Sequence, residues 1–422
     1  MIGTSLPKKL MLAAIVPLAL GAYAADVTMK PADHKKLGKL VAGWSEAKDE
    51  SKGINKAYVG ITQAIEKLEK KMKVADALTL VEDWEKAFFL ARLENLGKDI
   101  KLKKGKVTEA SAALANGSEA EFGVFAPGSY NPKKGPYPLF LVIGDEGSTP
   151  ATVLEEQWAD EAVRGSAILL VPKMPDDVGI WDKLEADKGM GGIGTIMSLY
   201  GKVLGEIPID MDRVYLVGHG AGAAAAARAA DLYPQLFAGL VVVDGKTPLI
   251  ATNFRNLPTL AVGSGDGSEG LATAIGALGY ENCTKMDSAT AADIWGWSED
   301  KVRNAYPSEI TFSPGHNYTT SAHWLSLQGV DVEAGPRVEA RIDKDANAIV
   351  IDAKKVTSIE ISFNDILVDM DKPVDVIING TSNPSTIARN KRLMLELNYK
   401  GGDWGRVFTN RMSFDVPVAE EK

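Results

Sequence analysis

The stretch that decides the fold is residues 209–230, IDMDRVYLVGHGAGAAAAARAA. Residues 214–217 form a short apolar run with β-branched members, which is typical of a buried strand. A glycine-rich turn at residues 218–222 follows, and then a run of alanines. Since little longer than a methyl group projects from most of that run, it predicts a helix lying close against a sheet.

The central residue of this turn is Gly220. In a nucleophile elbow, G-x-S-x-G, a serine stands at this position on a strained turn at the top of the sheet. A residue with a Cβ costs about 1 to 3 kcal/mol in such a backbone conformation. Glycine removes that cost, and it also removes the only atom that could attack a carbonyl. The turn therefore predicts an elbow whose nucleophile position is vacant.

Two further stretches carry a family resemblance. Residues 121–148, EFGVFAPGSYNPKKGPYPLFLVIGDEGS, place an aromatic–Pro–Tyr phrase before a buried strand, and residues 231–239, DLYPQLFAG, precede another. With the elbow, these phrases resemble exported α/β-hydrolases of the polyhydroxyalkanoate-depolymerase, feruloyl-esterase and prolyl-oligopeptidase-like group. The alternation of strands and helices predicts an α/β fold, a doubly wound, mainly parallel sheet.

The resemblance implies a triad in the order nucleophile, acid, histidine. The acid candidate is Asp266, which follows a predicted strand at 259–262 in a glycine-rich turn; the alternative is a structural turn residue. The loop at 282–290, where relatives carry the histidine, contains none. His316, in the phrase SPGHN, is the candidate base, or else it belongs to the C-terminal module.

The oxyanion loop departs from the family in its charge. Relatives end the strand in a His-Gly phrase whose loop supplies one amide, and the residue after the nucleophile, here Ala221, supplies another. This chain has Gly144, Asp145 and Glu146 instead. Carboxylates beside a developing negative charge oppose its stabilisation. We expect the turn to survive without a working oxyanion hole.

The first residues predict a signal peptide. Two lysines at 8 and 9 precede an apolar run at 10–20, and Ala22-Tyr23-Ala24 is a small-x-small cleavage site. The run is too short to span a bilayer. We expect residues 1–24 to be removed by cleavage near Ala24. The mature protein is then secreted or periplasmic, exported by a bacterium, and has no transmembrane segment.

Residues 25–105 have a helical pattern. Apolar residues at 54, 58, 61, 65, 68 and 72 are spaced four and three apart, and those at 77, 81, 84, 88 and 91 continue the seam. Packing against a core is the simpler interpretation, and presentation to a protein partner is the alternative.

The last part of the chain predicts a β-domain. After the α/β-hydrolase-like domain at 106–305, residues 306–418 show period-two runs separated by Asp, Asn and Gly turns. This β-sandwich-like module resembles the C-terminal β-domain of some exported relatives, through the phrase that contains Asp369, Asp371 and Asn379. His323 falls on an early strand of the module.

Composition excludes several classes of function. The net charge of -9 leaves no basic stripe for a nucleic-acid partner. Cys283 is the single cysteine, so no intramolecular disulfide can form. No spacing of histidine, cysteine and carboxylates indicates a metal site, and we expect no cofactor.

Three functional hypotheses follow. The first is a pseudo-hydrolase that acts in binding, scaffolding or assembly, with a small-molecule or peptide ligand in a vestigial cleft, or a protein partner on the helices or β-module. The second is an active exported esterase or peptidase that uses an unrecognised nucleophile, or a water activated by His219 or His316. The third is a surface-assembly protein in which the hydrolase domain is a spacer.

Overall fold

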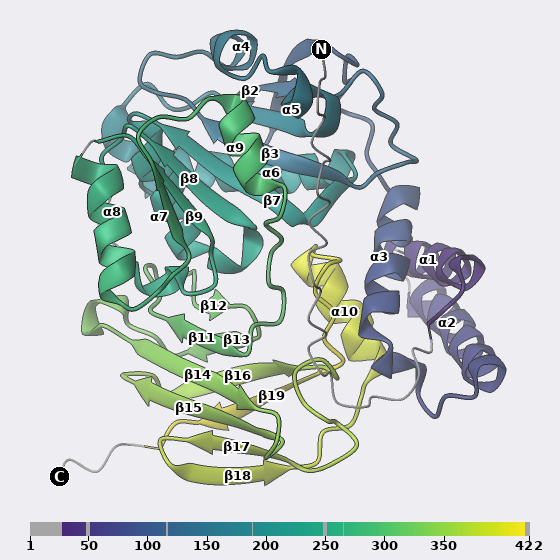
Figure 1. Ribbon diagram of the computed structural model, residues 1–422. Coiled ribbons are helices and arrows are strands. Elements are labelled where there is room, and N and C mark those ends of the chain that lie inside the picture. Colours follow the sequence, from purple (N-terminus) through teal and green to yellow (C-terminus); the bar gives the residue numbers. More distant parts are fainter. Residues whose placement is uncertain are drawn as a thin grey trace, which may run out of the picture.

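The computed structural model describes residues 28–47, 51–114, 117–187, 189–247, 251–264 and 266–417. The predicted signal peptide and its cleavage site lie outside these residues. Figure 1 shows three parts: a helical region on the right, an α/β domain above and a β-sandwich below. No helix in the described part of the chain is long and apolar enough to cross a membrane.

An eight-stranded sheet runs through the α/β domain as far as the structure describes it. The strand order is β1-β2-β4-β3-β7-β8-β9-β10. β1 is antiparallel to β2, and β2 to β4, whereas all later neighbours are parallel. In sheet order the strands are Val107–Ala113, Glu119–Phe125, Ile168–Pro172, Tyr137–Ile143, Ile209–His219, Gly239–Val243, Thr259–Val262 and Cys283–Met286. This is the predicted doubly wound, mainly parallel sheet of an α/β-hydrolase-like fold.

The strands bury side chains on both faces of this sheet. In β3, Leu139 and Leu141 pack into one core, whereas Phe140 and Val142 pack into the other, because successive side chains point to opposite faces. Helices α6, α7 and α8 cover the first face, and α5 and α9 cover the second. The helices of the domain are α4 Pro150–Thr152, α5 Glu161–Ser166, α6 Gly192–Glu206, α7 Gly222–Leu232, α8 Asp266–Ala277 and α9 Ala291–Ser298.

Helix α7 lies as close to the sheet as its alanines predict. A Cβ on Gly222 would lie 2.5 Å from the carbonyl oxygen of Gly144 and 2.6 Å from that of Ile143. The first turn of α7 therefore touches the backbone at the end of β3. This contact fixes the turn between β7 and α7 against the loop that follows β3.

One strand differs from the sequence-based prediction. The predicted loop at 282–290 contains β10, which pairs with β9. Because β10 is the last strand of the sheet, its side chains stay largely open to solvent and need not be apolar. That strand has no apolar run by which to recognise it. A separate ribbon is formed by β5 Glu185–Ala186 and β6 Gly189–Met190.

The helical region packs onto the α/β domain. Its helices are α1 Pro31–Glu46, α2 Ser51–Met72 and α3 Val81–Glu94. The predicted seam is buried, and Ile61, Trp84 and Phe88 belong to the same core as α6 and α7. Arg92 donates from Nε and Nη2 to the carbonyl oxygen of Leu204, over 3.0 and 2.8 Å. The apolar stripe of the helical region therefore packs into the core that it shares with α6 and α7.

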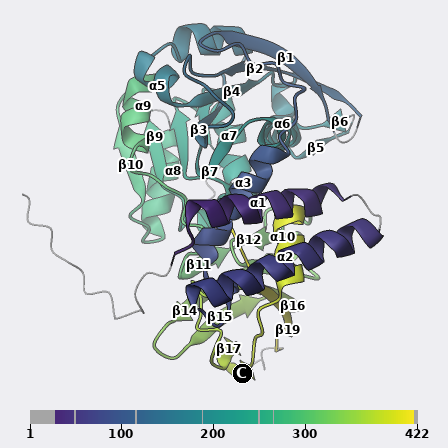
Figure 2. The same cartoon turned by 90° about the vertical axis from the view of Figure 1, so that its right-hand side faces the viewer.

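The C-terminal part is a β-sandwich. One sheet has the order β11-β14-β15-β17-β18 and the other β12-β13-β16-β19, and one apolar core lies between them. The strands are β11 Glu309–Phe312, β12 Ser321–Ala322, β13 Leu325–Gln328, β14 Arg337–Asp343, β15 Ala348–Lys354, β16 Ser358–Phe363, β17 Val374–Ile378, β18 Thr381–Ser385 and β19 Asn410–Asp415. His323 lies in the turn between β12 and β13, with φ +54°, and not on a strand. Helix α10, Lys391–Gly401, leaves the sandwich and lies between it and α3 (Figures 1 and 2).

A buried ion network joins the α/β domain to the sandwich. The Arg303 guanidinium lies 2.9 Å from Asp212 at the α/β domain and 2.6 Å from Asp403 after α10. Asp403 also accepts from Arg406 Nε over 2.8 Å. The side chains of Arg303 and Asp403 are only 1% and 4% exposed, so this pair is buried where the α/β domain meets the chain after α10.

Candidate functional site

Gly220 stands at the end of β7, in the middle of the sheet. Its amide donates to the carbonyl oxygen of Val243 on β8 over 2.9 Å. Its φ is +54°, in the left-handed region that glycine adopts without strain. Helix α7 begins two residues later, at Gly222. The structure thus places Gly220 at the centre of a strand–turn–helix elbow.

The carboxylate of Asp145 fills the space beside Gly220. A Cβ at Gly220 would lie 2.1 Å from both Cγ and Oδ1 of Asp145, and 2.3 Å from Oδ2. Asp145 Oδ1 accepts from the amide of Ala221 over 2.7 Å and from that of Glu146 over 2.8 Å. The carboxylate therefore lies where an elbow side chain would begin, and it is bonded to the amides around it.

These contacts extend the electrostatic prediction. An oxyanion hole in this fold uses the amide after the nucleophile and an amide of the loop after β3. The amides of Ala221 and Glu146 are in these positions, but the chain's own carboxylate is their acceptor. Asp145 does not merely oppose an oxyanion from nearby; it occupies the donors. The N-terminus of α7 stabilises this negative charge.

The loop that carries Asp145 is held by local hydrogen bonds. Ser148 donates to the carbonyl oxygen of Asp145 from its amide over 3.1 Å and from its hydroxyl over 2.6 Å. Thr149 then caps α4, since its hydroxyl oxygen accepts from the amide of Thr152. A capped loop of this kind holds the carboxylate in one place, although the Asp145 side chain is exposed to solvent.

His219 precedes the elbow but points to the opposite face of the sheet. Its Nε2 accepts from Trp158 Nε1 over 3.4 Å, and the two rings meet edge to face at 6.3 Å. Burial lowers the pKa of His219, with Asp145 and Asp244 acting in the other direction. His219 is a half-buried, neutral ring held by an indole.

The other predicted triad residues come from different elements. Asp266 is the first residue of α8 and not part of a turn. It follows β9, the second neighbour of β7, so about 10 Å of sheet separates the two strands. Gly315 directly precedes His316. Its carbonyl oxygen accepts from Nη2 of Arg228, a residue in the later turns of α7, over 2.7 Å. Gly220 precedes the first turn of α7 and lies eight residues before Arg228, and eight residues of helix span about 12 Å.

The loop between β10 and α9 has another role in this chain. Thr290 caps α9: its hydroxyl accepts from the amide of Asp293, and the Asp293 carboxylate accepts from the amide of Thr290. This capping box stands where the resemblance implies a histidine. The remaining histidine, His34, pairs with Asp83 over 2.8 Å in the helical region. The loop between β10 and α9 therefore supplies no histidine to the elbow at Gly220.

A cleft of about 340 Å³ opens beside the elbow. One side is the loop with Asp145 and Glu146, and the other is the chain after β4, with Lys173, Asp176 and Trp181. The cleft lies beyond the carboxyl ends of parallel strands, where open α/β sheets bind ligands. Within the described residues, no group of three or more histidine, cysteine, aspartate or glutamate side chains could hold a metal ion.

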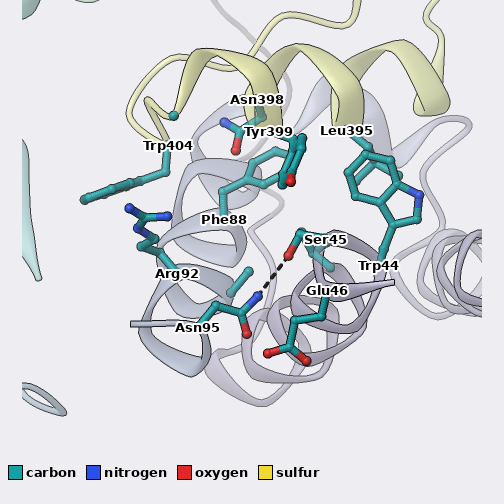
Figure 3. Close-up of a pocket in the computed structure, with 13 residues that line it drawn as sticks. Trp44, Ser45, Glu46, Phe88, Arg92, Asn95, Leu395, Asn398, Tyr399 and Trp404 are labelled. Carbon is teal, nitrogen blue, oxygen red and sulfur yellow. Dashed lines mark hydrogen bonds between the residues drawn. The ribbon is translucent and has the colours of Figure 1, made fainter. Parts of the chain in front are cut away.

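A second cavity, of about 650 Å³, lies between the helical region and α10. We call it the aromatic cavity, because Trp44, Phe88, Tyr399 and Trp404 form much of its wall (Figure 3). Trp44 and Tyr399 meet edge to face with their centroids 6.0 Å apart. Sequence reasoning missed this cavity, since its walls come from α1, α3 and the chain around α10, which are distant in sequence.

Polar groups complete the wall of the aromatic cavity. Asn95 donates from Nδ2 to the carbonyl oxygen of Ala42 over 3.2 Å and to Ser45 Oγ over 2.9 Å, a contact drawn in Figure 3. Asn398 donates from Nδ2 to the carbonyl oxygen of Asp403 over 3.1 Å. Asn95 uses both of its amide hydrogens within the protein and Asn398 uses one of its two, while the Oδ1 atom of each can accept from a ligand.

Comparisons with known proteins give distant structural likenesses. No family model and no curated protein matches the sequence. A thermostable esterase structure matches with 17% identity and a TM-score of 0.38, over 47% of this chain and 63% of its own, less than two thirds. A ferulic acid esterase matches with 12% identity and a TM-score of 0.39, over 46% and 96%. An S-formylglutathione hydrolase from Agrobacterium tumefaciens matches with 14% identity and a TM-score of 0.38, over 49% and 99%. The strand order and the elbow, and not these distant likenesses, define the fold.

Proposed function

We propose that this protein is a pseudo-hydrolase, an exported α/β-hydrolase-like protein that binds a ligand and does not cleave it. The observation that carries the proposal is the Asp145 carboxylate, which fills the nucleophile's space and accepts from the amide of Ala221. Covalent hydrolysis needs a nucleophile with a base within hydrogen-bond reach. The elbow offers glycine and no triad histidine. The targeting pattern of residues 1–24 supports export.

A second candidate function is hydrolysis by the Asp145 carboxylate or a water beside it. In its favour, this carboxylate is exposed and stands where a serine would begin. Against it, Oδ1 already accepts two amide hydrogens, which weakens it as a nucleophile or base. The same bonds occupy the donors that an oxyanion would need. We therefore favour the binding role.

The aromatic cavity is our first candidate for the ligand site. Ligand pockets typically enclose roughly 300 to 1,000 Å³, with mainly apolar and aromatic walls and a few convergent polar groups. The aromatic cavity, of about 650 Å³, meets this description. Its rings favour a ligand with a flat apolar body. The free Oδ1 atoms of Asn95 and Asn398 favour hydroxyl or amine donors on that body.

The cleft beside the elbow is our second candidate site. It is smaller, about 340 Å³, and carries the carboxylates of Asp145, Glu146 and Asp176 against one lysine, Lys173. This excess of negative charge favours a neutral or cationic small molecule or peptide over an organic acid.

The test pairs a binding assay with an activity assay. We expect neutral aromatic compounds with hydroxyl groups to raise the melting temperature of the mature protein. Trp44→Ala should abolish that shift, whereas Tyr318→Ala, which removes a 76% exposed ring outside the cavity, should retain it. Turnover of nitrophenyl esters that disappears in Asp145→Ala would instead support the second candidate. Ligand shifts that survive Trp44→Ala but not Trp181→Ala would move the site to the cleft beside the elbow.

A further inference from the structure

A third, small cavity lies where the α/β domain meets the sandwich, away from the elbow. It encloses about 120 Å³. Since one water takes about 30 Å³ of liquid volume, the cavity has room for about four waters or one small polyatomic ion. Its walls come from the β12–β13 turn, from strands β16 and β19, from the chain after α10, and from Gln235 of the α/β domain. We call it the junction cavity.

Two buried polar atoms at the junction cavity have no partner. Gln235 Oε1 and His323 Nδ1 make no hydrogen bond to any described residue. The Gln235 residue is only 8% exposed. Leaving such a group unsatisfied is unfavourable, because its lost contact with water is not replaced. Because both side chains line the same cavity, one polar occupant can satisfy both.

The other polar groups of the cavity are mainly hydrogen-bond donors. Arg406 donates from Nε to the Asp403 carboxylate and from Nη1 to the carbonyl oxygen of His323. Its Nη2 has no partner in the described structure. Arg411 donates from Nε to the Ser362 hydroxyl oxygen and pairs through Nη1 with Glu360. Its Nη2 likewise has no partner among the described residues. Two guanidinium groups with free N–H bonds are suited to an oxyanion.

Two hydroxyls add a further donor. Ser321 and Ser326 lie 2.6 Å apart across the β12–β13 pair and share one hydrogen bond, so one of the two hydroxyls keeps a hydrogen to donate elsewhere. Both serines line the cavity. The wall therefore offers donors from the β12–β13 pair, from β19 and from the chain after α10.

The charge around the cavity is positive. Arg406 and Arg411 line it together with one carboxylate, Asp403. Asp403 is already bound by Arg303 as well as by Arg406. Burial, and then Arg406 and Arg303, lower the pKa of His323 to about 3. The ring is therefore neutral, and the charges that act on it are cationic.

We propose that the junction cavity binds a small oxyanion that keeps one acidic proton, with inorganic hydrogen phosphate as the fitting example. Its oxygens accept from Arg406, Arg411 and a serine hydroxyl. Its P–OH group donates to Gln235 Oε1, which an oxyanion without a proton cannot do. Sulfate has the same size and shape but no proton at neutral pH. The site therefore distinguishes the two ions through Gln235.

The experiment titrates the mature full-length protein with phosphate and, separately, with sulfate at matched ionic strength. Binding is followed by isothermal calorimetry and by broadening of the phosphate signal in ³¹P NMR. We expect saturable phosphate binding and at least tenfold weaker sulfate binding. Arg411→Met should weaken phosphate binding about tenfold, the effect of one lost charge-assisted hydrogen bond.

Two further variants separate the site from general effects of charge. Gln235→Glu is nearly isosteric and adds a negative charge, so it should abolish phosphate binding. Arg392→Met removes a side chain on α10 that is 62% exposed and pairs only with Glu396, so it should bind phosphate as the wild type does. Circular dichroism identifies any variant that fails to fold, and Arg411→Met then serves in place of Gln235→Glu. Equal binding of phosphate by the wild type and Arg411→Met, or equal affinity for sulfate and phosphate, would overturn the proposal.

Discussion

Asp145 stands in the place of a side chain on Gly220. An ideal Cβ on Gly220 would meet the Asp145 carboxylate at 2.1 Å, while Asp145 Oδ1 accepts from the amide of Ala221 at 2.7 Å. The two residues come from different loops, after β3 and after β7. A glycine at one position makes room for a carboxylate at the other, so we treat them as one unit.

The first prediction concerns this pair. Gly220→Ala should lower the free energy of unfolding by about 2 to 3 kcal/mol, from the strained φ and from the displaced carboxylate. In an Asp145→Gly background the same change should cost only about 1 kcal/mol, since the clash is gone. Urea unfolding of the four proteins in this double-mutant cycle measures the coupling. Gly201→Ala, inside α6 with open space around its Cβ, should slightly stabilise the protein and is the control. Additive effects at 220 and 145 would contradict the pairing.

The second prediction asks whether a nucleophile can be restored. Gly220→Ser should stay inactive on ester substrates, both alone and with Asp145→Gly, because no histidine reaches the elbow from the loop after β10. A fluorophosphonate probe should likewise fail to label the double variant. Labelling or turnover would show that a base is in reach after all, with Asp266 and His316 or His323 the first residues to substitute.

The third prediction concerns the buried ion network. Arg303→Met leaves Asp403, whose side chain is 4% exposed, with one cationic partner instead of two. We expect a loss of about 3 to 5 kcal/mol in the free energy of unfolding, the usual cost of removing one partner of a buried pair. Arg392→Met, an exposed arginine, should change it by less than about 1 kcal/mol. A small effect of Arg303→Met in denaturant unfolding would show that the network contributes little to joining the domains.

The fourth prediction is a pH dependence. Burial raises the pKa of Glu85 to about 7, against the hydrogen bond from Tyr306. The folded state then binds more protons than the unfolded state between about pH 4.5 and 7, so stability falls as the pH rises through this window. Glu85→Gln should stabilise the protein at pH 8 by about 2 kcal/mol and flatten the profile. Burial also raises the pKa of Asp231 to about 6. Asp231 therefore maintains part of the pH dependence of stability in the Glu85→Gln variant.

This pH profile is measured by denaturant unfolding from pH 4 to pH 8. Tyr306→Phe offers a matched variant, because it removes the hydrogen bond that favours the charged carboxylate. It should move the Glu85 transition to higher pH. An unchanged slope in Glu85→Gln would refute the assignment to this residue.

Much of the fold could be predicted from the sequence, for physical reasons. The runs around β3, β4, β7 and β8 are apolar because these strands are buried on both faces. The alanines of α7 follow from its closeness to the sheet. β10 could not be predicted, since an edge strand with exposed side chains has no such pattern.

The site could be predicted only in part. Gly220 was identifiable because the elbow is a local pattern. The role of Asp145 was not, since it depends on a contact between residues 75 positions apart (220 − 145 = 75). His316 and Asp266 stand out as residue types in suggestive phrases, and the structure places them next to the later turns of α7 and at the start of α8. Cavities built from distant segments, such as the aromatic and junction cavities, have no signal in a single sequence.

The pairing of Gly220 with Asp145 implies that the elbow is chemically inert. The most direct measurement is the turnover of a panel of nitrophenyl esters and peptide anilides by the purified wild-type protein, beside Asp145→Ala and a buffer control. We expect that wild type and variant both match the buffer rate. Turnover by the wild type that Asp145→Ala abolishes would contradict it and would identify the carboxylate as part of a working site.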